Sequence, residues 1–585
     1  MPDENSRLTD LKVGIALLWS VLVRFRSIVA LSIVGALIWM AMVITMPYLV
    51  GRIIDEILTG QGMSAVWPLL VLILIAGFVQ AIGISVRRYF GFKVSYRAEA
   101  DLRNNIFTHI QRMAFSFHDV TSTGELMARA SSDLSQLRLI LAMAPITLAN
   151  LVMFFVVTIV LVLIDPVLGL TAALMVPALL ATSGQFANRV VGFSFDLQER
   201  LSHLSHVVEE TVAGIEVVKS YGQEAQQRDR ADAQAETIYS AALGMAKQRA
   251  IYRPLFEIIP AMGTVAVLAV GGIRVVDGQM TFGEFVAFTQ YLAVMVLPLL
   301  ITGWFFANLP RSAAAASRID ALLVTAPDII EASHPKTLKP GRGEIRFENV
   351  SFAYPDGTAV LSGVNLTIPG GTSVGVVGVT GSGKSTIAHL IPRFYDVDAG
   401  SITIDGVDIR DLRLDELRSE VAVVFQESYL FSTSIEANIR VGDPMASDER
   451  VRAAARLARA HDFICSFPDG YETVVGERGS TLSGGQRQRI SLARGIVRDP
   501  RILILDDATS SVDAIVESEI QEALRQVMSG RTTIIVAHRT STLALVDNVV
   551  FIEDGRVVAF APHDVLLDTV ERYVDVLAAR TELKT

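Results

Sequence analysis

One stretch decides the fold of this chain: Gly378-Val379-Thr380-Gly381-Ser382-Gly383-Lys384-Ser385. It has the Gly-x-x-x-x-Gly-Lys-Ser spacing of a phosphate-binding loop, in which glycines let the backbone turn tightly and aim its N–H groups at phosphates. We expect Lys384 to reach the β- and γ-phosphates and Ser385 to offer its hydroxyl to Mg²⁺. An apolar strand over 374–377 precedes the loop and a helix from Thr386 follows it, which predicts nucleotide at a helix N-terminus. A glycine turn between packed elements would not explain Lys-Ser at this place.

Composition narrows the class of protein. With 585 residues the chain is long enough for at least two domains, and with 51% hydrophobic and 19% charged residues it is more apolar than a typical soluble protein. The net charge of −10 argues against a nucleic-acid partner, which requires a basic face. Cys465 is the only cysteine, which excludes an internal disulfide and a cysteine-based metal cluster. The polar, acidic start predicts neither a secretory signal nor a transit peptide.

The N-terminal part, residues 1–307, is predicted to be an all-α membrane domain. Residues 11–26 are patterned as an amphipathic helix on the membrane surface. Six apolar stretches follow, each with about the ~20 residues that a spanning helix needs. They lie at about 27–50, 65–86, 140–163, 167–187, 258–276 and 281–307. A buried helix of a soluble protein is the alternative for any one of them, but six in a row, nearly free of charge, favour a membrane.

The links between these stretches alternate in length and charge. The links 87–139 and 188–257 are long, rich in arginine and lysine, and helix-patterned, which places them in the cytoplasm by the positive-inside rule. We therefore expect a multi-pass protein of a bacterial cell membrane, with its ATPase domain in the cytoplasm. Each long link is broken in the middle, at 115–126 and 219–224. These breaks are either short transverse helices that press against an ATPase domain or ordinary helix–helix turns.

The predicted spans contain almost no ionisable residues, which gives little support to a proton-coupled mechanism. Aromatic, methionine and amide side chains in the spans are candidates for an apolar substrate cavity, although such residues more often face lipid or pack between helices. These candidates are Gln80, Asn150, Phe154, Phe155, Phe288, Gln290, Tyr291, Met295, Trp304, Phe305, Phe306 and Asn308.

The C-terminal part reads as a linker followed by an α/β domain. Residues 308–341 contain Pro327, Pro335 and Pro340 and are predicted to be a linker. From residue 342 to 585, short β-branched runs alternate with charged helices, which predicts an α/β P-loop ATPase domain.

Further residues of this domain suit ATP chemistry. Tyr354 precedes a turn and is positioned either to stack on adenine or to lie half-buried beside a strand. A buried strand ends in Asp506 and Asp507, and a carboxylate beside a P-loop is the Walker B arrangement that holds Mg²⁺, although one Asp alone could cap the next helix. Gln426 follows a strand and is a candidate for a Mg²⁺ contact. His538 ends another strand, a position that is usually structural.

The run Leu482-Ser483-Gly484-Gly485-Gln486-Arg487-Gln488-Arg489 decides the family. With Walker A before it and Walker B just after it, the chain resembles the ATP-binding cassette transporters, and among them the exporter-type half-transporters, over nearly its whole length.

The resemblance implies roles for individual residues. It makes Tyr354 the adenine-stacking residue, Gly378–Thr386 Walker A, Gln426 the Q-loop glutamine and Gly476–Gly479 the X-loop. It also makes Ser483–Gln486 the signature, Asp506 the Walker B aspartate, Ser511-Val512-Asp513 the D-loop and His538 the switch histidine. The breaks near 118–124 and 220–226 resemble coupling helices.

One P-loop covers only one side of ATP, so a second subunit is expected. The signature of a partner would clamp the other side of the nucleotide, with a helix N-terminus aimed at the γ-phosphate. Two ATP molecules are then buried between two heads, whose closing and opening drives alternating access.

Asp507 departs from the family pattern, in which Glu follows the Walker B aspartate and polarises the attacking water. Asp is one methylene shorter, so its carboxylate falls ~1 Å short, which can cost ~10²-fold in rate. In the family this substitution is typical of the degenerate-site subunit of a heterodimer. A homodimer with two slow sites is the alternative.

The function expected is therefore ATP-driven export of a small amphiphilic or lipophilic compound, such as a drug or lipid. Import of a siderophore-like ligand and a regulatory or gating subunit that binds ATP are the alternatives. The sequence does not reveal the substrate.

Overall fold

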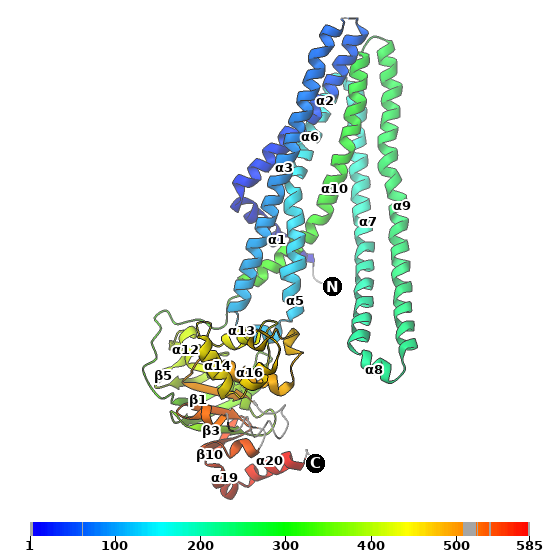
Figure 1. The fold of residues 1–585 in the computed structure, drawn as a ribbon. Coiled ribbons are helices and arrows are strands. Elements are labelled where there is room, and N and C mark those ends of the chain that lie inside the picture. Colours follow the sequence, from blue (N-terminus) through cyan, green and yellow to red (C-terminus); the bar gives the residue numbers. More distant parts are fainter. Residues whose placement is uncertain (1–3, 61, 507–521, 523, 538–539, 583–585) are drawn as a thin grey trace. The chain divides into compact units, whose positions relative to one another are not determined.

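The computed structural model describes residues 4–60, 62–506, 522, 524–537 and 540–582 (Figure 1). The chain divides into two compact units. The first comprises Met1–Gln111 and Thr123–Thr325, and the second comprises Arg112–Ser122 and Ala326–Thr585. A short segment of the N-terminal half therefore belongs with the C-terminal domain.

The first unit is helical. Its elements are α1 (Glu4–Arg24), α2 (Arg26–Leu58), α3 (Met63–Arg112), α5 (Thr123–Ala128), the π-helical turn η1 (Arg129–Asp133), α6 (Leu134–Ile164), α7 (Pro166–Ala213), α8 (Ile215–Ser220), α9 (Glu224–Val276) and α10 (Phe282–Val324). Helix α10 packs against α1, α2 and α6, and α7 runs beside α9 over much of its length (Figure 1).

Five helical stretches of the described residues are long and apolar enough to cross a membrane. They are Arg26–Leu58, Met63–Arg112, Thr123–Ile164, Glu224–Val276 and Phe282–Val324. The predicted span 167–187 falls inside α7, where the side chains of 171–180 lie outside the described set. The sixth span therefore stays a prediction.

Several predicted boundaries are wrong. The surface helix predicted at 11–26 begins earlier, at Glu4, and ends at Arg24. The short helices predicted near 118–124 and 220–226 lie a few residues earlier, at 115–120 and 215–220. In the second case Gly222, at φ +61°, forms the turn after the helix rather than the helix itself.

The linker predicted at 308–341 starts too early and ends too late. Helix α10 continues to Val324. At the other end, Lys336 pairs with Leu412 and Leu338 is buried in the core of the ATPase domain. The connecting segment is thus about as short as 325–335.

Three of the predicted cavity candidates are core residues instead, whereas Trp304 does line a cavity. Phe288, Tyr291 and Met295 of α10 pack with Met153 and neighbouring residues of α6 in one buried cluster. The Tyr291 hydroxyl donates a hydrogen bond of 2.7 Å to the Ile44 carbonyl. These side chains hold the bundle together.

The second unit contains two sheets. The antiparallel sheet has the order β2-β1-β4-β5, with β1 Ile345–Ala353, β2 Ala359–Ile368, β4 Ala399–Ile404 and β5 Val407–Asp408. The larger sheet has the order β10-β9-β3-β8-β7-β6. Its strands are β3 Ser373–Val377, β6 Val421–Val424, β7 Ile502–Asp506, β8 Thr532–Val536, β9 Asn548–Glu553 and β10 Arg556–Ala561, all parallel to their neighbours except β10. Strands β3, β7 and β8 are buried along their whole length, as expected for a parallel sheet covered on both faces.

Three buried clusters lie among the described residues of this unit, one of which packs Phe551 with Leu566 and Tyr573 near the C-terminal end. The other two are larger. One lies between the two sheets and around α11 (Lys384–Leu390), and the other lies under a set of helices. The remaining helices are α4 (Phe115–Val120), α12 (Leu414–Glu420), α13 (Ile435–Arg440), α14 (Asp448–Leu457), α15 (His461–Ser466), α16 (Gly484–Val497), α18 (Thr540–Leu543), α19 (His563–Thr569) and α20 (Glu571–Glu582). Short 3₁₀ turns lie at Ile409–Asp411, Gly470–Glu472 and Glu477–Gly479.

Candidate nucleotide site

The phosphate-binding loop leaves the end of β3 and turns into α11 at backbone angles that favour glycine. Gly381 has φ +83° and Gly383 has φ +98°. A Cβ atom on Gly378 would lie 2.2 Å from the Ile552 carbonyl oxygen. The loop therefore requires glycine both for its turns and for its close approach to β9.

Polar groups of this loop are buried where a phosphate chain would lie. Lys384 is only 5% exposed, and its ammonium donates to the Val379 carbonyl oxygen at 2.7 Å. The Ser382 hydroxyl is buried with no hydrogen-bond partner among the described residues. A buried hydroxyl without a hydrogen-bond partner is costly, and a phosphate oxygen would supply one. The ammonium of Lys384 in the same loop has the charge that a phosphate needs.

Ser385 and Asp506 meet at one edge of the sheet. Strands β3 and β7 flank β8 and run parallel, so their carboxyl ends lie on the same side. The Ser385 hydroxyl donates to Asp506 Oδ1 at 3.2 Å. A hydroxyl and a carboxylate are the hard oxygen ligands that Mg²⁺ prefers, so the residues present fit that ion.

Gln426 lies at the same edge. It follows β6, which pairs with β7 in the register Val424 with Leu505, and its side chain is exposed. Three other residues singled out by the sequence, Asp507, Asp513 and His538, lie outside the described residues.

Tyr354 comes directly after β1 and is half-buried. Its hydroxyl shares a hydrogen bond of 3.1 Å with the Thr386 hydroxyl of α11. Its ring meets Phe352 and Tyr395 edge to face, with centroid distances of 5.0 and 5.4 Å. Burial is the main cause that raises the pKa of Tyr354, so its hydroxyl stays protonated.

The signature lies at the N-terminus of α16, over the second core. The Ser483 hydroxyl accepts a hydrogen bond from the Gln486 backbone N–H at 3.3 Å, and Gln486 Oε1 accepts one from the Ser483 N–H at 2.9 Å. This capping box fixes an exposed hydroxyl at a helix N-terminus. The predicted X-loop precedes it as a 3₁₀ turn over Glu477–Gly479.

Sequence reasoning missed the residues that hold α4 in this unit. The Phe115 ring stacks on Phe394 at 4.4 Å between centroids, with planes 20° apart. The Asp119 carboxylate accepts a hydrogen bond of 2.6 Å from the Tyr395 hydroxyl, and Ser116 donates one to Asp328. These partners are hundreds of residues apart in the chain, so no local sequence pattern predicts their contacts.

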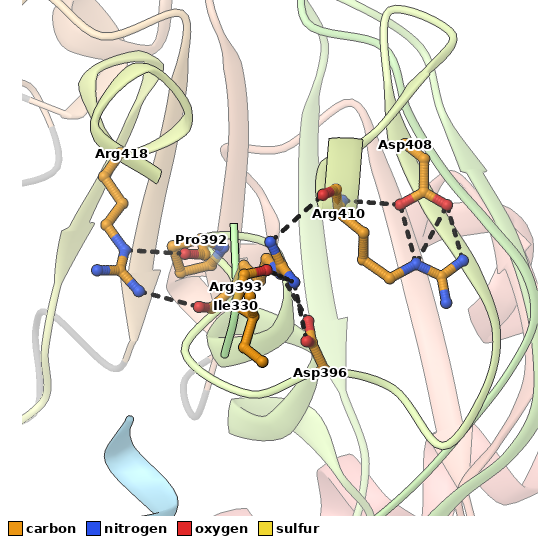
Figure 2. A network of polar contacts seen from close by, with 7 residues as sticks. All are labelled: Ile330, Pro392, Arg393, Asp396, Asp408, Arg410 and Arg418. Carbon is orange, nitrogen blue, oxygen red and sulfur yellow. Dashed lines mark hydrogen bonds and ion pairs between the residues drawn. The ribbon is translucent and has the colours of Figure 1, made fainter. Parts of the chain in front are cut away.

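A buried arginine network shapes the turn 391–396 that carries Phe394 and Tyr395 (Figure 2). Arg393 is 3% exposed and donates to both Asp396 oxygens, at 2.6 and 2.9 Å, and to the Ile330 carbonyl at 3.2 Å. Arg418 donates to the carbonyls of Pro392 and Arg393 and lies over the Phe394 ring. The network joins the connecting segment to the turn and fixes the two aromatic rings.

Burial changes the protonation of two groups beside this turn. It lowers the pKa of His389, which lies near the Phe394 and Phe425 rings, so the imidazole is neutral at pH 7. Burial, and next the hydrogen bond to Asp119, raises the pKa of Tyr395 above its usual range. The phenol therefore remains the donor to the carboxylate.

Two family descriptions match the chain: "ABC transporter transmembrane region" over residues 29–299 and "ABC transporter" over residues 361–510. An "ATP-dependent lipid A-core flippase" of Syntrophus aciditrophicus (strain SB) is 35% identical over 93% of this chain and 90% of its own length. The chain belongs to the ATP-binding cassette transporters. This ABC transporter joins one transmembrane region to one nucleotide-binding domain, the organisation of an exporter half-transporter.

Other relatives bear on the same conclusion. A "Multidrug efflux ATP-binding/permease protein" of Mycobacterium bovis (strain BCG / Pasteur 1173P2) is 34% identical over 96% of this ABC transporter, which spans only 47% of that relative's length. A solved structure of a bacterial Atm1-family ABC exporter with ATP bound has a TM-score of 0.81 at 28% identity, over 95% of this chain and 98% of that one. The protein is thus a multi-pass membrane protein with a cytoplasmic, ATP-binding domain, as predicted.

Proposed function

We propose that this ABC transporter exports a small amphiphilic or lipophilic compound, driven by ATP binding and hydrolysis, together with a second half-transporter. The observation that carries the proposal is the convergence of Ser385 and Asp506 at 3.2 Å below the phosphate-binding loop. Relatives named as a lipid A-core flippase and a multidrug efflux protein support export of amphiphiles.

Within the site, each residue takes a role suited to its position. Lys384 neutralises the β- and γ-phosphates from its buried place in the loop. Ser385, Asp506 and Gln426 would hold Mg²⁺, which would neutralise phosphate charge during hydrolysis. Tyr354 offers its ring to adenine, and His538 contacts the γ-phosphate.

Ser483 acts on the nucleotide of the partner. Its hydroxyl accepts a hydrogen bond from Gln486 N–H and so keeps its own proton free to donate to a γ-phosphate oxygen. Gly484 and Gly485 add no side chain at the helix start, so a phosphate could approach its backbone N–H groups closely. The signature of one subunit then completes the site of the other.

We also propose that Asp507 makes this chain the subunit with the slow site of a heterodimer. Purified alone, the chain is expected to hydrolyse ATP slowly, and Asp507→Glu is expected to raise turnover by up to ~10²-fold, since it restores the reach of the carboxylate. Asp507→Asn serves as the matched control and should give no gain. Fast hydrolysis by the unmodified chain alone would refute the heterodimer.

Transport itself is tested with inside-out vesicles that contain the chain and its partner. ATP-dependent uptake of a fluorescent amphiphile is expected for the unmodified protein and should fall in Lys384→Ala. If Lys384→Ala vesicles accumulate the amphiphile as well as the unmodified vesicles do, this chain only regulates transport. Efflux in place of uptake would indicate an importer.

A further inference from the structure

A cavity of about 660 Å³ lies within the helical unit, between α3, α6 and α10. Two adjacent arginines, Arg87 and Arg88, line it together with a wall of apolar side chains that includes Met143, Ile146 and Trp304. Its volume is that of a ligand pocket for a drug-sized or lipid-sized molecule. None of the described residues that line it is acidic.

The two arginines lack the partners that their neighbours have. Further along α3, Glu99 pairs with Arg103 and Arg138, and Asp101 pairs with Arg24. Among the described residues, no carboxylate forms an ion pair with Arg87 or Arg88. The Arg87 guanidinium instead lies over the Trp39 ring at 5.0 Å, and its Nε is buried without a hydrogen bond. A partly buried cation with an unused donor stabilises a bound anion.

The cavity lies at the level where headgroups of the cytoplasmic leaflet are expected. Arg87 directly follows the predicted span 65–86. The α6 lining begins at Leu139, where the predicted span 140–163 starts, and the α10 lining lies near the end of the span 281–307. All three helices thus contribute their cytoplasmic ends. An anion at the arginines has apolar side chains beside it.

We propose that this cavity receives a phospholipid-like amphiphile from the cytoplasmic leaflet, with its phosphate on Arg87 and Arg88 and its hydrocarbon on the Met143–Ile146 wall. Arginine suits this role because its planar donors bind two phosphate oxygens at once. The inference rests on the proposed export function and narrows its substrate to anionic amphiphiles.

Binding of tail-labelled fluorescent phosphatidylglycerol and phosphatidylcholine, followed by anisotropy in neutral detergent without ATP, tests this inference. Phosphatidylglycerol is expected to bind more tightly than the zwitterionic lipid. In Arg87→Gln/Arg88→Gln its affinity should fall about tenfold or more, since two charge-assisted hydrogen-bond donors are lost. Arg97→Gln on the same helix removes one positive charge away from the cavity and should leave the affinity unchanged.

A second variant guards against misfolding of the first. Ile146→Trp fills the apolar wall and keeps both arginines, so it should weaken binding of the long-chain lipid while the protein stays monodisperse. Equal affinity for the two lipids, or unchanged binding in both variants, would overturn the inference. So would full displacement of the lipid by millimolar glycerol 3-phosphate, which would identify a soluble anion as the ligand.

The test separates this inference from the export function. Binding is measured in detergent without nucleotide. Selective binding by a protein whose vesicles transport nothing would therefore contradict export and leave the cavity assignment in place. Transport of neutral amphiphiles, together with no preference for anionic lipid in the binding assay, would support export and contradict the cavity assignment.

Discussion

The hydrogen bond between Tyr395 and Asp119 should control how firmly α4 is held in the C-terminal unit. Helix α4 has only six residues and no side-chain cap at its start, so it is not stable by itself. Its backbone protection therefore reports its contacts with Phe394 and Tyr395. Tyr395→Phe removes the hydroxyl and leaves the ring in place.

The size of the effect follows from the two environments. The Tyr395 ring is buried, with 7% exposed, whereas Asp119 is exposed and its carboxylate can regain water. A charge-assisted hydrogen bond of this kind contributes about 1.5 kcal/mol, the lower end of its range. Tyr395→Phe should thus raise the open fraction of α4 about tenfold. Asp119→Asn keeps a hydrogen-bond acceptor but loses the charge. Because neutral hydrogen bonds are about half as strong, this variant should raise the open fraction of α4 only about threefold.

Hydrogen exchange of the peptide 112–122 in the full chain, read by mass spectrometry, measures these fractions. The double variant Tyr395→Phe/Asp119→Asn should exchange like Tyr395→Phe alone, because the two changes remove one interaction. Tyr573→Phe is the matched control: it removes a buried hydroxyl that bonds His563 at 2.7 Å elsewhere in the unit. The reasoning would be refuted if the effects of the two substitutions on exchange added up in the double variant. It would also be refuted if exchange of the peptide 112–122 did not change.

Three further predictions follow from the same unit. Burial lowers the pKa of His389 below its ordinary 6.5, so as the pH falls the unfolded chain takes up the proton before the folded chain does. Thermal stability should therefore be constant above about pH 6.5 and fall below it. His389→Gln should flatten that fall in melting curves at about pH 5.5–7.5. Gly378→Ala places a Cβ 2.2 Å from the Ile552 carbonyl, so ATP binding by equilibrium dialysis should be lost, and an unchanged affinity would contradict the close approach. Asn438 is fully buried and its side chain bonds Phe431 and Arg494, so Asn438→Ala should lower unfolding stability by about 2–4 kcal/mol in denaturant titrations; a loss below 1 kcal/mol would show that the network carries little.

The meeting of Ser385 and Asp506 was predictable because both residues stand in strong local patterns. A strand, a glycine loop and Lys384-Ser385 occupy adjacent positions, and Asp506 ends an unmistakably apolar strand. Parallel strands then bring Ser385 and Asp506 together, as their contact of 3.2 Å confirms. Helix ends were predicted less well. The alanines at 313–316 extend α10 past Pro310, a residue that sequence reasoning took as part of a linker.

The α4 contacts and the arginine cavity were not predictable for a physical reason. Asp119 and Tyr395 are 276 positions apart, and each has an unremarkable local sequence. Arg87 and Arg88 look like two of many cytoplasmic arginines. Only the cavity that α3, α6 and α10 line together distinguishes them, because its other lining residues are apolar.

One short helix links the phosphate loop to the residues that hold α4. Helix α11 begins with Lys384 at the loop and ends at Leu390, directly before the turn that presents Tyr395. Tyr354 connects the same two places a second time, because its hydroxyl bonds Thr386 and its ring contacts Tyr395. If adenine stacks on Tyr354, it lies on a ring that also contacts Tyr395, the residue that holds Asp119. Nucleotide binding and α4 docking then depend on the same aromatic contacts. A substitution that weakens one is therefore expected to weaken the other.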